Sequence, residues 1–267
     1  MVAGEKVEAA RRRARLVSSL NRSILITGAS SGLGAALAKD LASRGARLAL
    51  CARRVERLEE LAHELETHGA KAEAISCDVA DEFSLARAFD IAERALGSID
   101  GVIANAGVSL PGAALEQEID AFDRMISINV RGAFLTAREG ARRMRSRGVS
   151  DGRIIFIASI AAHTPLKQLA GYCASKAGVA MLARALALEW AGDGVSVNAI
   201  CPGYAPTEMN AGWFASEAGQ RQLARFPRRR LVACEAITAM AAQLLAPEAA
   251  QVTGSVITVD DGQSFRL

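Results

Sequence analysis

The stretch ILITGASSGLG, Ile24–Gly34, decides the fold. Its aliphatic start, Ile24–Thr27, predicts a short strand buried on both faces. A turn of small residues follows and leads into the helix-forming run 33–39. A strand, a glycine turn and a helix start together make a dinucleotide phosphate site, because glycines let the backbone approach the pyrophosphate and the positive end of the helix faces the anion. Such turns also occur without a ligand, so the other motifs must decide.

Short apolar runs alternate with longer helical runs along the rest of the chain. We expect strands at 47–51, 73–77, 99–104, 153–158, 195–200 and 255–259, and helices near 35–44, 54–67, 82–96, 118–146, 171–190 and 234–246. The strict β-then-α order predicts right-handed crossovers and helices on both faces of the sheet. The sequence therefore predicts a single α/β domain over 21–267, a doubly wound parallel sheet of about seven strands.

Composition excludes several classes of protein. The 267-residue chain is 51% hydrophobic but only 4% aromatic, which suits helices packed on an aliphatic sheet. The net charge of +3 is spread along the chain and gives no general nucleic-acid footprint. The five cysteines form no C-x-x-C pair, which argues against a disulfide framework or a metal site and for a reducing compartment. With no membrane-span pattern and no apolar signal region, we expect a cytoplasmic protein.

The basic extension 1–20 stands apart from the domain. Its cluster Arg11–Arg15 lies in a run of helical propensity, which favours a short solvated helix over an arm for nucleic acid or an acidic partner. We therefore do not expect a nucleic-acid partner.

Residues directly after each strand are informative, because doubly wound sheets bind ligands at the carboxyl ends of their strands. After the second strand, arginines occupy the position where an NAD-preferring site carries Asp or Glu. Arg53 therefore favours NADP(H), with NAD(H) as the alternative, although a solvated arginine pair explains the same residues. Asp78 and Val79 follow the third strand, where a carboxylate can accept from an adenine amino group. Asn105–Gly107 follows the fourth and leaves room for a cofactor.

A chemical centre is predicted around Tyr172 and Lys176, four residues apart in a strongly helical segment. This spacing puts both side chains on one helix face. We expect the lysine ammonium to lower the tyrosine pKa from about 10 towards neutrality, and an amphipathic surface pair is the competing interpretation. Ser159 ends an apolar strand, where it can donate to a carbonyl oxygen or cap a helix. Asn129 lies mid-helix against its propensity, which indicates a local task such as holding a water or a backbone group near Lys176.

Together these motifs resemble the short-chain dehydrogenase/reductase family over about residues 22–263. The chain carries the family's T-G-x-x-x-G-x-G start at 27–34, its Ser…Tyr-x-x-x-Lys centre and its P-G-x-x-x-T segment at 202–207. Two motifs differ slightly, since Ala104 replaces the first Asn before N-A-G and Asp261 stands in the closing V-D-G-G where glycine is common. The resemblance implies a Rossmann-type fold and hydride transfer between NAD(P)(H) and a secondary alcohol or ketone.

The resemblance also implies roles for individual residues. Tyr172 would exchange a proton with the substrate oxygen, Lys176 would bind the nicotinamide ribose, and Ser159 would polarise the substrate. Asn129 would hold a relay water. Because Ser31 occupies a position that is often basic in NADP-dependent members, the preference for NADP(H) depends on Arg53. The residues implied to bind the cofactor are Gly28, Ser30, Ser31, Gly32, Leu33, Gly34, Arg53, Asp78, Val79, Asn105, Ala106, Gly107, Tyr172, Lys176, Pro202, Gly203 and Thr207.

The substrate and the partners stay open. The segment 207–231 is expected to form a lid, with Met209, Trp213 and Phe214 as candidate pocket residues. A 3-oxoacyl thioester, a sugar or polyol, and a cyclic alcohol are alternative substrates. A non-catalytic dinucleotide sensor is the alternative class, against which the complete catalytic centre argues. The family implies a homotetramer or homodimer. The arginines after Gly140 can meet an acidic carrier protein or form a solvated helix end: Arg142, Arg143, Arg145 and Arg147.

Overall fold

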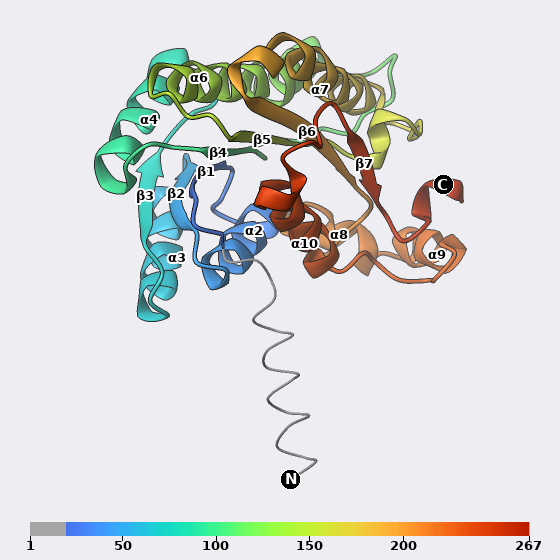
Figure 1. Cartoon of the computed structure of the whole chain (residues 1–267). Coiled ribbons are helices and arrows are strands. Elements are labelled where there is room, and N and C mark those ends of the chain that lie inside the picture. Colours follow the sequence, from blue (N-terminus) through green and yellow to red (C-terminus); the bar gives the residue numbers. More distant parts are fainter. Residues whose placement is uncertain (1–19, 267) are drawn as a thin grey trace, which may run out of the picture.

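A seven-stranded parallel sheet forms the centre of the protein, in the order β3-β2-β1-β4-β5-β6-β7 (Figure 1). The computed structural model describes residues 20–266, apart from the side chain of Met209, so the expected helix in the extension 1–20 lies outside the described residues except at Leu20. The strands are β1 (Ser23–Thr27), β2 (Arg47–Ala52), β3 (Ala72–Ser76), β4 (Gly101–Ala104), β5 (Gly152–Ile157), β6 (Val195–Pro202) and β7 (Val256–Val259). The predicted doubly wound fold is confirmed.

Helices cover both faces of this sheet because each βα unit returns by a right-handed crossover. On one face α4, α6 and α7 bury the side chains around Phe89, Phe156 and Val179, and on the other α2, α3 and α10 bury those around Leu37, Leu50 and Ile237 (Figure 1). The helices are α2 (Gly32–Ser43), α3 (Val55–Thr67), α4 (Glu82–Leu96), α5 (Ile119–Ile126), α6 (Ala133–Ser146), α7 (Ala170–Glu189), α8 (Glu208–Ala215), α9 (Glu217–Arg225) and α10 (Cys234–Leu245).

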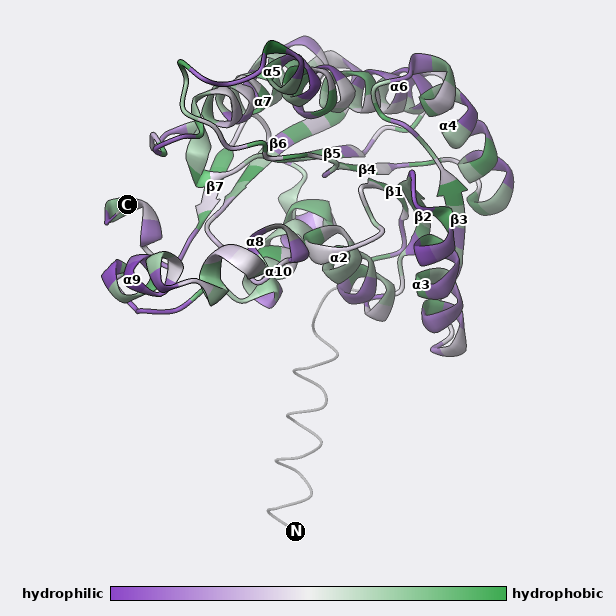
Figure 2. Ribbon diagram, turned by 180° about the vertical axis from the view of Figure 1, so that it is seen from behind, coloured by the Kyte–Doolittle hydropathy of each residue, from purple (hydrophilic) through white to green (hydrophobic). Residues whose placement is uncertain are grey.

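Burial explains why the strands lack an alternating pattern. Every residue of β1, β5 and β6 is buried, since helices pack on both sides. Figure 2 shows the hydrophobic residues along these central strands and hydrophilic residues on the outer surface of α3. The strand order reverses between β1 and β4, which pair with the register Ile26↔Ile103. At such a switch point the loops leave in opposite directions and open a crevice.

The expected helix 118–146 is present from Ile119 to Ser146, but it is not α-helical throughout. A π-helical segment, Ser127–Gly132, separates α5 from α6 and carries Asn129. The wider turn inserts a local change of helical phase, a feature that frequently occurs at functional sites.

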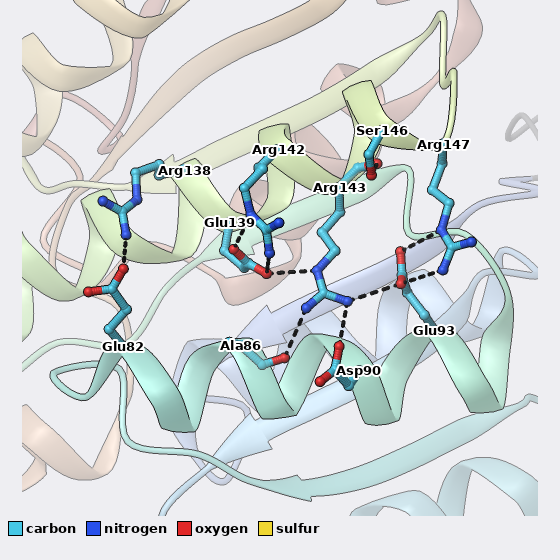
Figure 3. Close-up of polar contacts among 10 residues, drawn as sticks. All are labelled: Glu82, Ala86, Asp90, Glu93, Arg138, Glu139, Arg142, Arg143, Ser146 and Arg147. Carbon is cyan, nitrogen blue, oxygen red and sulfur yellow. Dashed lines mark hydrogen bonds and ion pairs between the residues drawn. The ribbon is translucent and has the colours of Figure 1, made fainter.

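Three of the four arginines at the end of α6 are solvated as expected: Arg142, Arg145 and Arg147 are 60%, 69% and 55% exposed. Arg143 differs. Arg143 is only 13% exposed and donates to Glu139 at 2.7 Å and to Glu93 at 3.1 Å (Figure 3). Arg142 also bonds Glu139, and Arg147 bonds Glu93 at 3.0 Å. Acids on α4 and α6 therefore engage Arg142, Arg143 and Arg147 within the chain and join the two helices.

Candidate active site

A cavity of about 790 Å³ lies at the carboxyl ends of the strands. Its size is typical of a small-molecule or cofactor site. Every predicted catalytic or cofactor-binding residue except Asn129 lines it, although these residues come from segments far apart in the sequence: Gly28, Ser30, Ser31, Gly32, Leu33, Gly34, Arg53, Asp78, Val79, Asn105, Ala106, Gly107, Ser159, Tyr172, Lys176, Pro202, Gly203 and Thr207.

The glycine turn after β1 is built for a close approach of backbone. Gly28 has φ +69°, and a Cβ on Gly34 would lie 2.2 Å from the Gly28 carbonyl oxygen. Ser31 precedes α2 without a side-chain cap, and the first helical bond runs from Ala35 N to Ser31 O at 3.3 Å. The preceding N–H groups of the first turn, which line the cavity, can therefore bind an anion such as a pyrophosphate.

Asn105 braces this turn. Its Nδ2 donates to Thr27 O at 2.9 Å and to Gly28 O at 3.2 Å, and its own N–H donates to Thr27 Oγ1 at 3.1 Å. The side chain of Asn105 is thus used within the protein to hold the end of β4 against the end of β1. At Gly107 a Cβ would lie 3.5 Å from Lys176 Nζ, so a small residue keeps the lysine accessible.

Two arginines that directly precede α3, Arg53 and Arg54, lie beside the glycine turn. Arg53 lines the cavity as expected, but it is Arg54 that donates to Ser30 Oγ at 3.1 Å and to Ser31 Oγ at 2.8 Å. The sequence marked both arginines, and only the direction of the side chains distinguishes them. Asp78 also lines the cavity, and its Oδ1 accepts from Ala80 N at 3.0 Å within its own turn.

Tyr172, Ser159 and Lys176 meet at the other end of the cavity. Lys176 is 5% exposed, and its Nζ donates to Ile157 O at 2.9 Å and lies 5.7 Å from the centroid of the Tyr172 ring. Ser159 Oγ accepts from Ala161 N at 3.1 Å, so it caps a short 3₁₀ turn while its hydroxyl hydrogen stays available. Both interpretations of Ser159 are therefore compatible.

The electrostatics of this centre correct one expectation. Burial raises the pKa of Tyr172 to about 12, although a hydrogen bond with Ser159 opposes the rise. Burial also lowers the pKa of Lys176 to about 8. The protein's own groups do not bring the tyrosine pKa towards neutrality, because desolvation outweighs the hydrogen bond with Ser159. The lysine ammonium lies over the ring and bonds a backbone carbonyl, not the phenol oxygen.

Asn129 stands behind the cavity wall and is 1% exposed. Its Oδ1 accepts from Val108 N at 2.8 Å, and its Nδ2 donates to Val108 O at 2.9 Å and to Ser175 Oγ at 3.0 Å. The expectation of a backbone-holding role near Lys176 is confirmed. The relay water stays a prediction.

The sequence did not identify Tyr204, which also lines the cavity. Its ring packs edge-on against Phe214 at 5.3 Å and stacks on Phe226 at 5.9 Å between centroids. Phe214 is buried in this cluster and does not line the cavity, whereas Trp213 does. The expected pocket role of Met209 lies outside the described side chains. The position of Tyr204 directly after Pro202-Gly203 was the available signal.

The described residues offer neither a metal-binding cluster nor a helix that could span a membrane. Within residues 20–266, no cluster of His, Cys, Asp and Glu can hold a metal ion. In the same part of the chain, no helix combines the length and apolarity needed to cross a membrane.

The fold and the cavity define an α/β protein with a dinucleotide-type site beside a Tyr–Lys–Ser centre. The family model described as short chain dehydrogenase matches residues 22–218. A cis-4-hydroxycyclohexanecarboxylate dehydrogenase of Sinomonas cyclohexanicum is 36% identical over 90% of this chain and 96% of its own length. A D-threitol dehydrogenase of Mycolicibacterium smegmatis is 35% identical over 91% and 92%. A crystal structure of an actinorhodin polyketide ketoreductase variant with NADPH superposes with a TM-score of 0.85 at 33% identity, over 91% of this chain and 97% of its own.

The chain therefore belongs to the short-chain dehydrogenase family. It is an NAD(P)-dependent oxidoreductase that interconverts a secondary alcohol and a ketone.

Proposed function

We propose that the cavity binds NADP(H) along the glycine turn and that Tyr172, Ser159 and Lys176 carry out the chemistry at its far end. The main support for this proposal is that these three side chains line the same cavity as the start of α2, whose first N–H groups have no side-chain cap. A proton donor and an anion-binding helix end thereby share one space, as hydride transfer to a carbonyl requires.

Each residue has a role that its surroundings support. The nicotinamide supplies or accepts the hydride when bound. Ser159 donates its hydroxyl hydrogen to the substrate oxygen and polarises the carbonyl. Tyr172, whose pKa is raised to about 12 by burial, is protonated at neutral pH and gives its proton to that oxygen during reduction. Lys176 holds ribose hydroxyls with the N–H bonds that Ile157 O does not take. Asn129 fixes Val108 and so shapes the wall of the cavity beside them.

NADP(H) is the preferred cofactor in this proposal. Arg53 and Arg54 line the cavity after β2, and no acid stands there to accept from a ribose 2′-hydroxyl. NAD(H) is the alternative, which a comparison of dissociation constants for NADPH and NADH tests directly.

The substrate end favours a cyclic or otherwise apolar secondary alcohol. Tyr204, Trp213 and Leu166 line it with aromatic and aliphatic surface. The likeness to a dehydrogenase of a hydroxycyclohexane carboxylate supports this choice. A polyol and a 3-oxoacyl thioester are the alternatives, supported by the threitol dehydrogenase and by the ketoreductase structure.

The test is direct transfer of label. NADPH carrying deuterium at C4 of the nicotinamide is incubated with a panel of cyclic ketones, hydroxyketones and 3-oxoacyl thioesters. We expect deuterium on the carbinol carbon of the cyclic alcohol product, detected by mass spectrometry. Binding of NADPH without any labelled product from the panel would instead favour the dinucleotide sensor.

Assembly and location complete the proposal. Apolar side chains stand exposed on α5 and α7, namely Ile119, Met181 and Leu188, which supports a homodimer or homotetramer through these helices. All five cysteines are free thiols, which supports a reducing compartment such as the cytoplasm. Light scattering coupled to size exclusion would measure the assembly.

A further inference from the structure

Glu208 connects the lid to the arginines at the mouth of the cavity. It is the first residue of α8, and its carboxylate accepts from Arg57 Nη1 at 2.8 Å and 3.0 Å. Arg54 Nη1 lies 3.7 Å from the same carboxylate, while its Nη2 bonds the hydroxyls of Ser30 and Ser31. The start of the lid, the start of α3 and the glycine turn are thus joined by one chain of polar contacts.

Two carboxylates line this cavity among the described residues, Asp78 and Glu208, and of these Glu208 is the one that forms ion pairs with the α3 arginines. A phosphate on the adenosine ribose is a doubly charged acceptor that requires the same guanidinium donors. A carboxylate already bound to these donors must be displaced by the phosphate or share them with it.

We propose that Glu208 is a specificity-determining residue, whose carboxylate competes with the ribose 2′-phosphate of NADP(H) for Arg54, the arginine of the pair that lines the cavity. The inference rests on the proposed binding of a dinucleotide in this cavity. NAD(H) has no phosphate at that position and leaves the ion pairs intact. Glu208 therefore weakens binding of NADP(H) selectively and moderates the preference that the arginines create.

The competition also links the lid to the cofactor. Glu208 begins the same helix that carries Trp213, a residue of the cavity wall. When the phosphate takes Arg54, the helix loses its contact with that arginine and is held to α3 by Arg57 alone. The helix itself keeps its capping box between Thr207 and Asn210, so loss of this contact loosens the helix without unfolding it.

Binding measurements without any substrate test the competition. Dissociation constants of NADPH and NADH are measured by nicotinamide fluorescence for the wild type, Glu208→Gln and Glu217→Gln. Glu217 is the matched control, because it also lies in the first turn of a lid helix and pairs with an arginine, Arg221, but is not part of the cavity wall. We expect Glu208→Gln to bind NADPH roughly two- to five-fold more tightly, as exposed charge pairs allow, with NADH changed by less than about 1.5-fold. Glu217→Gln should change neither.

A second measurement follows the lid. The chain has two tryptophans, so Trp190→Phe leaves Trp213 as the sole emitter. In this background 2′,5′-ADP should shift the Trp213 emission and 5′-AMP should not, and Glu208→Gln should reduce the difference between the two nucleotides.

The outcomes separate this inference from the proposed function. If neither NADPH nor NADH binds the wild type, the dinucleotide site itself is wrong. If both bind but Glu208→Gln leaves the NADPH constant unchanged or weakens it, Glu208 does not compete with the phosphate. An equal gain for NADPH and NADH would also overturn the inference, since the effect would not depend on the phosphate.

Discussion

Lys176 Nζ lies 5.7 Å from the centroid of the Tyr172 ring and is bonded to Ile157 O at 2.9 Å. The ammonium thus stands over the face of the phenol, and its hydrogen bond points to the end of β5. This arrangement leaves the tyrosine with a pKa of about 12 and the lysine with one of about 8, because both groups are desolvated. The pair therefore favours a protonated phenol beside a charged lysine at neutral pH.

These two pKa values predict opposite pH dependences for the two directions of reaction. Reduction uses the protonated phenol, so its kcat/KM should be flat up to about pH 8 and fall above it, where Lys176 loses its charge. Oxidation needs the phenolate, whose fraction rises about tenfold per pH unit below the tyrosine pKa. Steady-state rates in both directions across pH would check this. An oxidation rate that is already level at neutral pH would contradict it.

Asn129→Ala should lower the free energy of unfolding of the protein as well as its kcat. The substitution leaves the N–H and C=O of Val108, a partly buried residue of the cavity wall, without their side-chain partner. Water in the cavity can reach these groups in part, so we expect roughly 1–2 kcal/mol less free energy of unfolding, the lower part of the range for unsatisfied groups. Urea denaturation measures the loss. A large fall in kcat at unchanged stability would show that a relay water, and not the Val108 contacts, is the main role of Asn129.

Gly34→Ala should disrupt the glycine turn, because its Cβ would meet the Gly28 carbonyl oxygen at 2.2 Å. Backbone must shift to relieve that contact, which we expect to cost about 2 kcal/mol or more and to weaken dinucleotide binding. Gly192→Ala is the matched control, since a Cβ there meets nothing within 4 Å. Thermal denaturation and NADPH titration of both variants check the expectation. Equal effects at the two positions would argue against a tight turn.

The ion pairs between α4 and α6 predict that the free energy of unfolding falls at acidic pH. Burial opposes ionisation of Glu93, but hydrogen bonds from Arg147 and Arg143 outweigh it and hold its pKa below the usual range. A carboxyl with a lowered folded-state pKa stabilises the fold above its unfolded pKa of about 4.3, and this contribution is lost as pH falls through the folded value.

Arg143→Ala should therefore cost about 1–3 kcal/mol at neutral pH, since it leaves a largely buried carboxylate with one partner fewer. The difference from wild type should shrink below about pH 4. Arg145→Ala is the control, because its contact with Asp193 is 3.9 Å long and its side chain is 69% exposed. Urea denaturation of the wild type and both variants at several pH values tests this prediction. A loss of unfolding free energy in Arg143→Ala that does not change with pH would contradict the ionic explanation.

Local signals predicted most of the fold. The aliphatic runs and the βα order gave all seven strands, because a parallel sheet buried on both faces needs continuous apolar residues. The π-helical segment Ser127–Gly132 within the predicted helix could not be predicted, since a π-helical turn has no strong local pattern.

The sequence predicted the parts of the site that depend on local turn geometry. The prediction was incomplete where the site depends on the direction in which long side chains point. Gly28, Tyr172 and Lys176 occupy positions fixed by backbone geometry. The choice between Arg53 and Arg54, the acid Glu208 and the pairing of Arg143 with Glu93 depend on how segments far apart meet. The predicted lowering of the Tyr172 pKa was wrong, because the spacing of two residues along a helix does not show how far they are desolvated.

Tyr172→Phe removes the phenol hydroxyl that we assign as the proton donor. The variant keeps the ring but has no proton to give to the substrate oxygen. NADPH should bind with an unchanged dissociation constant, while single-turnover reduction of a ketone substrate at pH 7 slows by about 10²–10⁴-fold. A Tyr172→Phe protein that binds NADPH and reduces the ketone at the wild-type rate would contradict the assignment of Tyr172 as the proton donor.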